Sequence, residues 1–396
     1  MPSRRTFLAA LGATTLAGCT TLAGSTPDEP PEPGVDELPT PEKHVYGANG
    51  DWSSFGCNAG NTRAVGDGKA PTDGVTERWR VEIPQLRQHE PIVAGGRVYQ
   101  LSDGLRVLDT ADGSELWRNA EIRTLPLVRE GRLYAGTTDG LVALDPETGE
   151  SRWKRTFGEN ASVRAPATYA GERLYAPADE TLFALDPETG EVDWSRELFG
   201  RLLGSPAVYS GHYVAVASEA GKLFLVGPDG VGAGEWNLPA TPKAPPTADT
   251  DAVYVNCLDG RTYGIVLENA PRRGIDWKTE TGWASGGLAA KKYFYANGTS
   301  GLHALDPDTG EKRWRFDTGD WRHTAPALGR DTLFVGGDAL YALDPTPKSV
   351  PLADGPAVRF ERSFHGRVGP GSTLDDGVLY VVAQTGESAY HLLALE

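Results

Sequence analysis

The sequence predicts an all-β fold, an eight-bladed β-propeller built from four-stranded antiparallel blades. The eleven-residue phrase ALDPETGESRW at 143–153 returns nearly unchanged at 184–194 and 304–314. Seven tryptophans recur with gaps of 38, 36, 41, 42, 41 and 37 residues, namely Trp79, Trp117, Trp153, Trp194, Trp236, Trp277 and Trp314. Eight apolar segments, each opened by Pro or Gly, follow the same spacing. A period near 40 residues without helical stripes is typical of one propeller blade per repeat.

Each repeat contains the strands of one blade in order. PIVAGGRVYQL (91–101) reads as an inner strand, a turn and a returning second strand, and equivalent segments open at 126, 166, 206, 246, 287, 326 and 370. A second turn, such as TTDG at 137–140, leads to a third strand that ends in Ala-Leu-Asp. The repeated tryptophan then lies on the fourth strand. We expect its indole to dock on the neighbouring blade, because a large buried aromatic stabilises such an interface.

The repeated Asp, Pro and Gly suit a tight turn between the third and fourth strands. Asp accepts hydrogen bonds from turn amides, Pro presets φ, and Gly adopts positive φ without strain. We therefore interpret Asp145, Asp186 and Asp306 as turn caps and not as catalytic acids.

The two ends of the repeat region complete each other. The eighth repeat ends at HLLALE (391–396) without an outer strand, whereas TERWRVE (76–82) carries Trp79 without a blade of its own. Pairing of 76–82 with 391–396 would close the ring and remove two exposed strand edges. In the seventh repeat, Phe360 takes the tryptophan position.

The segment before the repeats reads as an export signal and an anchor. Arg4 and Arg5 precede an apolar stretch at 7–17 that is too short to span a membrane. SRRTFL (3–8) resembles a twin-arginine signal, and LAGC (16–19) resembles a lipobox whose Cys19 would be lipidated. We predict a signal peptide at 1–18, a disordered Pro- and acid-rich tether at 19–45, a cap at 46–75 and the propeller at 76–396. The expected location is the outer face of the cytoplasmic membrane.

Composition limits the partners. The formal net charge is −16, which argues against nucleic acid, because phosphate binding needs surplus Lys and Arg. With 10 Lys against 28 Arg and one Met, the acidic composition resembles that of extreme halophiles and points to a haloarchaeal source. We expect a monomer.

The repeat resembles a known family. A-x-D-x-x-T-G-x-x-x-W is the motif of the PQQ-like, quinoprotein-type propellers, and it is looser at 108–117 and eroded at 226–236 and 266–277. GDWSSFGCNAGNTRA (50–64) is similar to the lead-in of exported members. The family includes quinoprotein alcohol dehydrogenases and BamB, a lipoprotein scaffold for outer-membrane protein assembly. The lipobox places this chain with the BamB-like branch.

The same resemblance implies which groups a PQQ-dependent dehydrogenase of this family would need. The dehydrogenases hold PQQ against a disulfide between adjacent cysteines, beside a Ca²⁺ cage and a catalytic Asp. Beyond Cys19 this chain has only Cys57 and Cys257, which are far apart in sequence and have no metal-ligand spacing. We therefore expect no catalysis, no PQQ, no Ca²⁺ and no metal site. A disulfide between Cys57 and Cys257 and two separate thiols remain alternatives.

The loops that enter each blade suggest a binding site. In such propellers these loops converge on the mouth of the central channel, and here they are rich in base. They carry Arg87, His89, Arg123, Arg164, Arg201, Lys243, Trp283, Trp321, Arg322, His323, His365 and Arg367. Acids in nearby turns could neutralise this ring, namely Asp103, Asp139, Asp179, Glu219 and Asp259.

From this ring we hypothesise a non-catalytic protein-binding or assembly scaffold with a cationic channel mouth. Arg and Trp are enriched among residues that dominate binding energies. The alternatives are a PQQ-dependent dehydrogenase and a sensor that binds a small anion. The sequence identifies neither the partner nor the ligand.

Overall fold

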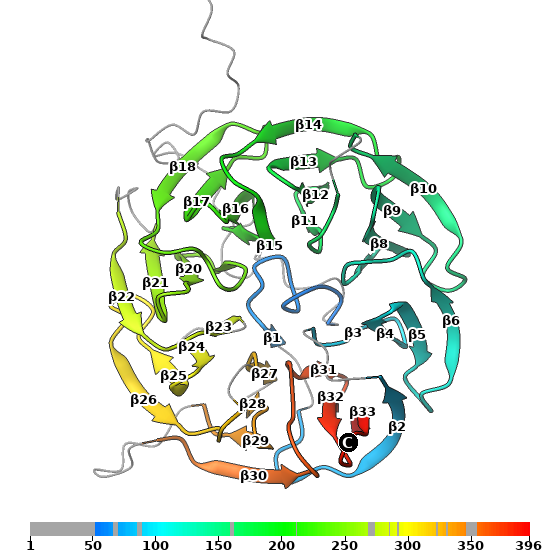
Figure 1. Cartoon of the computed structure of the whole chain (residues 1–396), viewed down its shortest axis with the longest axis vertical. Helices are drawn as coiled ribbons and strands as arrows, with labels where there is room; N and C mark the ends of the chain where they lie inside the picture. The colour runs from blue at the N-terminus through cyan, green and yellow to red at the C-terminus, as the bar shows by residue number, and fades with distance from the viewer. Residues whose placement is uncertain are drawn as a thin grey trace, which may run out of the picture.

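Eight four-stranded antiparallel sheets stand around a central axis in the computed structural model, which confirms the eight-bladed propeller (Figure 1). The structure describes residues 52–65, 70–84, 89–158, 162–210, 212–267, 274–284, 286–290, 293–321, 324–329, 332–345 and 355–396. These residues form strands, turns and loops without a helix, so nothing in the described part is a helix long enough to cross a membrane. The predicted signal peptide, Cys19 and the tether lie outside the described ranges.

The first four blades follow one another along the chain. Blade 1 contains β3 (Ile92–Ala94), β4 (Arg97–Ser102), β5 (Gly104–Asp109) and β6 (Glu115–Asn119). Blade 2 contains β7 (Leu127–Arg129), β8 (Arg132–Thr137), β9 (Gly140–Leu144) and β10 (Ser151–Thr156). Blade 3 contains β11 (Thr168–Ala170), β12 (Arg173–Ala178), β13 (Thr181–Leu185) and β14 (Val192–Glu197). Blade 4 contains β15 (Leu202–Tyr209), β16 (Tyr213–Ser218), β17 (Lys222–Val226) and β18 (Gly232–Asn237).

The remaining blades complete the ring. Blade 5 contains β19 (Thr247–Ala248), β20 (Ala252–Asn256), β21 (Arg261–Val266) and β22 (Trp277–Glu280). Blade 6 contains β23 (Gly287–Ala290), β24 (Tyr293–Gly298), β25 (Gly301–Leu305) and β26 (Lys312–Phe316). Blade 7 contains β27 (Ala327–Gly329), β28 (Thr332–Val335), β29 (Ala339–Leu343) and β30 (Val358–Ser363). Blade 8 contains β31 (Thr373–Asp375), β32 (Val378–Gln384), β33 (Tyr390–Leu395) and β2 (Glu77–Ile83).

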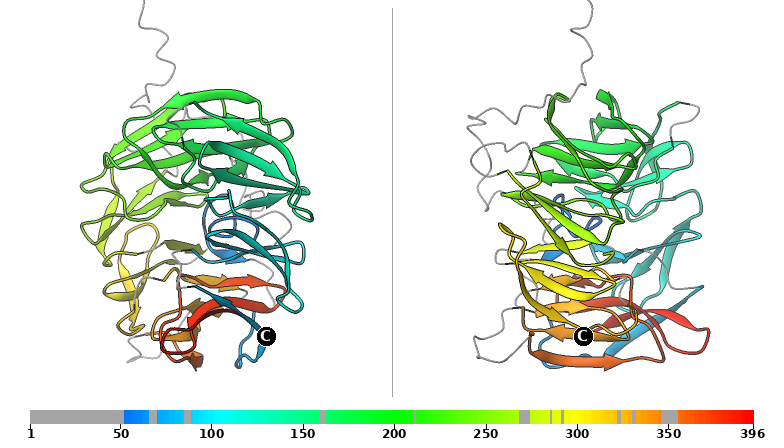
Figure 2. Two further views of the ribbon diagram at one scale, coloured as in Figure 1. Left: turned by 45° about the vertical axis from the view of Figure 1, so that its right-hand side comes forward. Right: turned by 60° about the vertical axis from the view of Figure 1, so that its left-hand side comes forward.

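The ring closes through its two ends as the sequence predicts. β2 runs antiparallel to β33, with Glu77 opposite Leu395 and Ile83 opposite Tyr390. Thr76 and Glu396 exchange two further backbone hydrogen bonds of 2.7 and 2.9 Å. In Figure 2 the outer strand β2 lies beside the C-terminal strands of blade 8. Closure pairs β33 on both sides, with β32 and β2, and gives blade 8 an outer strand like those of the other blades.

The repeated tryptophans bridge consecutive blades. Trp153 packs against Tyr134 of its own blade, at 5.9 Å between ring centroids, and its Nε1 donates to the Pro187 carbonyl of the next blade at 3.0 Å. The same bond joins Trp79 to Thr110, Trp117 to Pro146, Trp194 to Pro228 and Trp277 to Pro307. Trp236 and Trp314 are buried as well, but the turns opposite them lie partly outside the described residues.

The repeated turn has the predicted internal bonds. In blade 3, Asp186 Oδ1 accepts from the backbone N–H groups of Glu188 and Thr189 at 2.8 Å each. Gly190 adopts φ +69° and places its backbone against the Trp153 ring. The phrase therefore serves contact between blades, with its carboxylates used inside turns.

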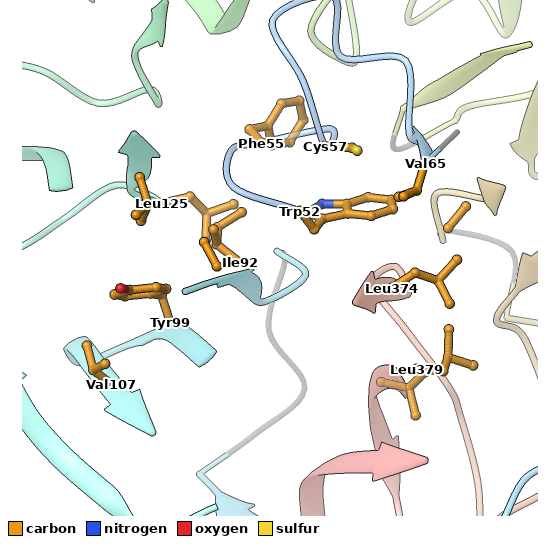
Figure 3. Packing of buried hydrophobic residues seen from close by; sticks show 14 of the residues in the cluster. Trp52, Phe55, Cys57, Val65, Ile92, Tyr99, Val107, Leu125, Leu374 and Leu379 are labelled. Atoms are coloured by element: carbon orange, nitrogen blue, oxygen red, sulfur yellow. The ribbon is translucent and has the colours of Figure 1, made fainter. Parts of the chain in front are cut away.

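Residues 52–65, which we call the plug, occupy the central channel (Figures 1 and 3). Their carbonyl oxygens accept hydrogen bonds from inner-strand amides around the ring: Trp52 from Val93, Ser53 from Val128, Ala59 from Val208, Gly60 from Ala248 and Arg63 from Leu328. β1 (Ala64–Val65) adds a parallel strand to β27. Trp52 and Phe55 are buried in a cluster with residues of blades 1, 2, 7 and 8. The lead-in sequence thus fills the channel from within.

Candidate functional site

A cavity of about 810 Å³ lies at one end of the channel. All eight connections that enter the blades contribute to its wall, from His89 and Glu90 before β3 to Arg367 and Pro370 before β31. Phe55 and Arg63 of the plug also line it. Because the plug fills the channel beneath, the cavity is a cup with a floor and does not continue as an open pore.

The structure gathers most of the described residues of the predicted ring at this cavity. Seven of them line it: His89, Arg123, Arg164, Lys243, Trp283, Trp321 and Arg367. Arg201 and His365 are exposed but do not line it. Arg87, Arg322 and His323 lie outside the described residues. The described lining contains five Arg and Lys side chains and one carboxylate, that of Glu90.

Arg201 is the clearest departure from the prediction. β15 begins at Leu202, so Arg201 sits at the outer end of a long inner strand and its backbone carbonyl accepts from Glu219 N at 2.8 Å. Its guanidinium forms an ion pair with the Glu219 carboxylate. The start of β15 lines the cavity instead of Arg201, through Leu203, Gly204 and Ser205.

Three of the other turn acids bond to groups outside the predicted ring. Asp139 pairs with Lys154 at 3.7 Å, and Asp259 pairs with Arg261 at 3.2 Å, both outside the cavity lining. Asp179 accepts from the Ser162 backbone at 3.1 Å. Of these three and Glu219, only Glu219 forms a described ion pair with a predicted ring residue.

Backbone hydrogen bonds fix the loops that carry Lys243 and Trp283. Asn256, at the end of β20, accepts from Lys243 N with its carbonyl at 2.7 Å. Its side chain donates to the Gly282 carbonyl and accepts from Ala284 N, both at 2.9 Å. Trp283 Nε1 donates to the Leu258 carbonyl at 2.8 Å, and the ring remains 44% exposed. The indole thus has its polar atom satisfied and its face available.

Three arginines lie on other parts of the rim. Arg367 lies over the Trp321 ring with its Cζ 4.6 Å from the ring centroid, a cation–π contact. Arg164 Nε donates to Ser162 Oγ at 2.8 Å, and Arg123 Nη1 donates to the Ala120 and Ile122 carbonyls. All three side chains are exposed, and their contacts within the described part of the chain are with neutral groups, so no described carboxylate is paired with them.

The floor holds a buried ion pair. Arg63 Nη2 lies 2.7 Å from Glu90 Oε1, with the two side chains 2% and 3% exposed. The Arg63 guanidinium is 5.0 Å from the Phe55 ring centroid. Burial lowers the pKa of the neighbouring His89; Glu90 partly opposes this effect, and Arg63 lowers the pKa by a smaller amount. His89 is therefore neutral at pH 7, and the cations of this lining are Arg and Lys.

Sequence reasoning did not assign Arg63 or Phe55 to the mouth. Both lie in the lead-in segment at 50–64, which the sequence predicts only to pack as a cap. Arg63 has φ +57°, an uncommon backbone conformation for a side chain of its size. The four prolines of the wall, Pro166, Pro242, Pro245 and Pro370, are signalled in the sequence by their positions at or near strand openings.

The residues of the cavity do not fit a Ca²⁺–PQQ site. Its described lining offers one carboxylate, which already faces Arg63. Across the described ranges, His, Cys, Asp and Glu form no group of three that could hold a metal ion. Cys57 and Cys257 are separate buried thiols in different clusters, which corrects the disulfide alternative. Cys57 Sγ contacts the Ala64 carbonyl oxygen at 3.6 Å, and burial raises the pKa of Cys257 to about 12.

Comparison with solved structures agrees with the fold. BamB from Moraxella catarrhalis is 18% identical, with a TM-score of 0.62 over 81% of this chain and 100% of that one. Quinohemoprotein alcohol dehydrogenase from Comamonas testosteroni is 14% identical, with a TM-score of 0.66 over 87% and 80%. The computationally designed Ika8 protein is 12% identical, with a TM-score of 0.61 over 80% and 99%. At these identities the likeness extends to the fold alone.

Sequence comparison gives the family. A comparison with curated proteins returned no match. The family model described as outer membrane protein assembly factor BamB matches residues 70–143, 138–275 and 298–396, which is most of the chain. With the repeated Trp-bearing turn and the eight closed blades, this match assigns the chain to the family of BamB-type, PQQ-like β-propellers.

Proposed function

We propose that this protein is a non-catalytic binding scaffold whose cationic cavity takes an acidic segment of a polypeptide. The observation that carries the proposal is the cup itself: exposed Arg and Lys side chains from different blades surround one cavity, and Arg123 and Arg164 among them bond to neutral groups. The formal charge of the whole chain is −16, so this face is opposite in sign to the rest of the molecule. A local field of one sign attracts and orients a ligand of the other sign.

Two features favour a polypeptide over a purely ionic ligand. Trp283 and Trp321 lie at the same rim as the cations, and Trp and Arg are the side chains that most often dominate protein interfaces. The family description, an assembly factor, points to the same class of partner. The cavity volume also lies within the usual range of small-molecule sites, roughly 300–1,000 Å³, so a small anion is the second candidate.

Catalysis with PQQ is not part of this proposal. The donor set at the cavity does not suit Ca²⁺, and the two described cysteines are separate thiols. We infer that no PQQ and no metal ion are needed for the binding role.

We further propose that the domain is exported and held at the outer face of the cytoplasmic membrane through Cys19. The support is the Arg4–Arg5 pair and the LAGC motif. A two-chain lipid anchor holds stably, because each buried methylene contributes about 0.8 kcal/mol.

The test measures binding of a fluorescein-labelled acidic peptide, a 12-residue Glu- and Asp-rich sequence with apolar residues, by anisotropy. The variant Arg164→Glu/Lys243→Glu reverses two rim charges whose described side-chain contacts include no carboxylate. The control Lys154→Glu/Lys278→Glu makes the same charge change on outer strands away from the cavity.

We expect the rim variant to weaken binding at least tenfold and the control to change it less than twofold. Equal loss in both variants would mean that the peptide senses only the net charge. Absence of peptide binding by the wild type, with citrate or inorganic phosphate bound at the rim, would replace the scaffold with a small-anion sensor.

A further inference from the structure

The floor of the cavity contains an unused hydrogen-bond donor. Arg63 Nη1 is buried and has no hydrogen-bond partner among the described residues. The Glu90 contact does not satisfy it: Glu90 Oε1 lies 2.7 Å from Nη2, and that approach lacks hydrogen-bond alignment. A buried donor of a charged group without a partner is costly, because it has lost its bonds to water and gained none in return. Such a group therefore requires an explanation.

Arg63 combines this cost with a second one. Its φ of +57° lies in the left-handed region, where a side chain of this size is strained. Both features occur at one residue on the floor of the cavity, and neither contributes to the contacts between blades. Costly groups of this kind tend to gather where a ligand supplies the missing interaction.

Glycines leave the guanidinium edge uncovered. A Cβ added to Gly371 would lie 3.5 Å from Arg63 Nη1, and one added to Gly286 would lie 3.0 Å from Nε. With glycine at both positions, no side chain from either residue stands against these nitrogens. Neither residue has positive φ, so backbone conformation does not explain the glycines.

The residues that line the cavity differ in burial. Arg63 is 1% exposed. The apolar part of the lining, which we call the belt, consists of alanines, Leu203 and four prolines, namely Pro166, Pro242, Pro245 and Pro370, and these side chains are buried or half-buried. The cations Arg123, Arg164, Lys243 and Arg367 are exposed. Graded by burial, the lining thus offers a buried donor, an apolar belt and a cationic entrance.

We propose that the cavity captures the C-terminal end of a polypeptide: a free α-carboxylate at Arg63 Nη1, an apolar last side chain in the belt, and acidic residues at the rim. This inference rests on the proposed scaffold function and specifies its ligand. An internal acidic segment could reach the floor donor only with an Asp or Glu side chain, and its main chain would have to enter and leave the cavity. A chain end enters once and brings its own carboxylate, which leaves its last side chain for the apolar wall. Capture of a terminal carboxylate by buried donors is a known mode of peptide recognition.

The experiment compares two forms of one peptide, acetyl-Glu-Asp-Glu-Ala-Leu, with a free C-terminal carboxylate or a C-terminal amide. Affinities for the full-length protein are measured by calorimetry at one ionic strength. Loss of a charge-assisted hydrogen bond corresponds to roughly a tenfold to hundredfold loss of affinity. We therefore expect the carboxylate form to bind at least tenfold more tightly than the amide.

Gly371→Ala tests the site without removing a charge. The added methyl would contact Glu90 Oε2 at 3.4 Å and Arg63 Nη1 at 3.5 Å, which are ordinary van der Waals distances. Gly274→Ala, where an added Cβ meets nothing within 4 Å, is the matched control. We expect Gly371→Ala to reduce the preference for the carboxylate form to about twofold or less while affinity for the amide persists, and Gly274→Ala to keep the full preference.

The possible failures are distinguishable. Equal affinity of the carboxylate and amide forms overturns the terminal-carboxylate proposal and leaves the rim as an acidic-segment site. A preference that survives Gly371→Ala places the carboxylate away from Arg63 and also overturns it. If neither form binds and the acidic 12-residue peptide does not bind either, the scaffold function fails together with this inference.

Discussion

Alanine at Gly190 should destabilise the propeller by disturbing the contact between blades 2 and 3. Gly190 has φ +69°, and an added Cβ would lie 2.7 Å from Trp153 Cε3 and 2.8 Å from its Cδ2. Real Cβ atoms do not approach ring carbons this closely, so the indole or the turn must move. The indole is held by its 3.0 Å bond to the Pro187 carbonyl and by the Tyr134 ring, which makes that movement costly.

A control variant separates the cost of positive φ from the cost of the clash with the Trp153 ring. Gly171, in another turn of the same blade, has φ +53°, but an added Cβ meets nothing within 4 Å. Positive φ costs an L-residue about 1–2 kcal/mol, offset by about 0.4–1 kcal/mol from the stiffer unfolded chain. Gly171→Ala should therefore lose roughly 1 kcal/mol. Gly190→Ala should lose a further ~1–3 kcal/mol through overpacking.

Urea unfolding followed by far-UV circular dichroism, together with thermal melting, measures the difference. One kcal/mol shifts Tm by roughly 2 °C in a chain of this size, so the two variants should differ by about 2–6 °C. Gly190→Ala with Trp153→Phe should recover part of the loss, because the smaller ring vacates space and neighbouring substitutions are not additive. Equal melting points for Gly190→Ala and Gly171→Ala would refute the role of the Trp–Gly contact.

Two further predictions concern acid stability and anchoring. Burial, with smaller contributions from the charges of Lys312 and Arg315, lowers the pKa of His303 from 6.5 to about 4, so the folded protein holds this imidazole neutral. The unfolded chain takes up the proton first as pH falls, so stability is full above pH 6.5 and declines by roughly 3 kcal/mol down to pH 4. His303→Gln should flatten the unfolding free energy over that window; an unchanged slope would contradict this assignment. Cys19→Ala should release the protein from membrane pellets into the external fraction on sucrose-gradient fractionation, and retention of the variant in the pellet would argue against lipid anchoring.

Local repetition explains why the fold was predictable. Each blade carries its own turn phrase, so Asp186 bonds two amides within three residues of itself, and the Trp153 contact lies in the adjoining repeat. The pairing of β2 with β33 was predictable because the last repeat lacks an outer strand, and the first Trp-bearing strand lacks a blade. These inferences need only short sequence separations or a count of strands.

The plug could not be derived in this way. Its carbonyl groups bond to inner strands as distant as Val93 and Leu328, and its residues do not repeat. Asn61 Nδ2, for example, donates to the carbonyls of Ser205, Pro206 and Pro246. No local pattern indicates which blade each plug residue meets, so the depth of the cavity and the place of Arg63 were beyond sequence reasoning.

The repeat also predicted most of the residues at the channel mouth. Loop position along the repeat was enough to bring Arg164 and Lys243 to one cavity, because every blade presents the same connection to the axis. The early start of β15 placed Arg201 outside it, beside Glu219. β15 begins four residues before Pro206, whereas β3 begins one residue after Pro91, and this earlier start sets the Arg201 side chain beside a neighbouring turn.

The repeat and the plug have different roles, and this difference indicates which residues determine ligand specificity. The Trp, Asp and Gly of the repeat act at blade contacts and inside turns, so related blades can share them without affecting what the protein binds. The channel, in contrast, is occupied by one segment that occurs once, and the backbone bonds of blades 1, 2, 4, 5 and 7 each go to a different residue of it. An eightfold ring of loops alone would offer eight similar positions, whereas the plug places a single buried cation, Arg63, at the centre of the floor. Selection for a ligand would therefore act on the plug and the loop tips, and the repeat would keep those tips in register.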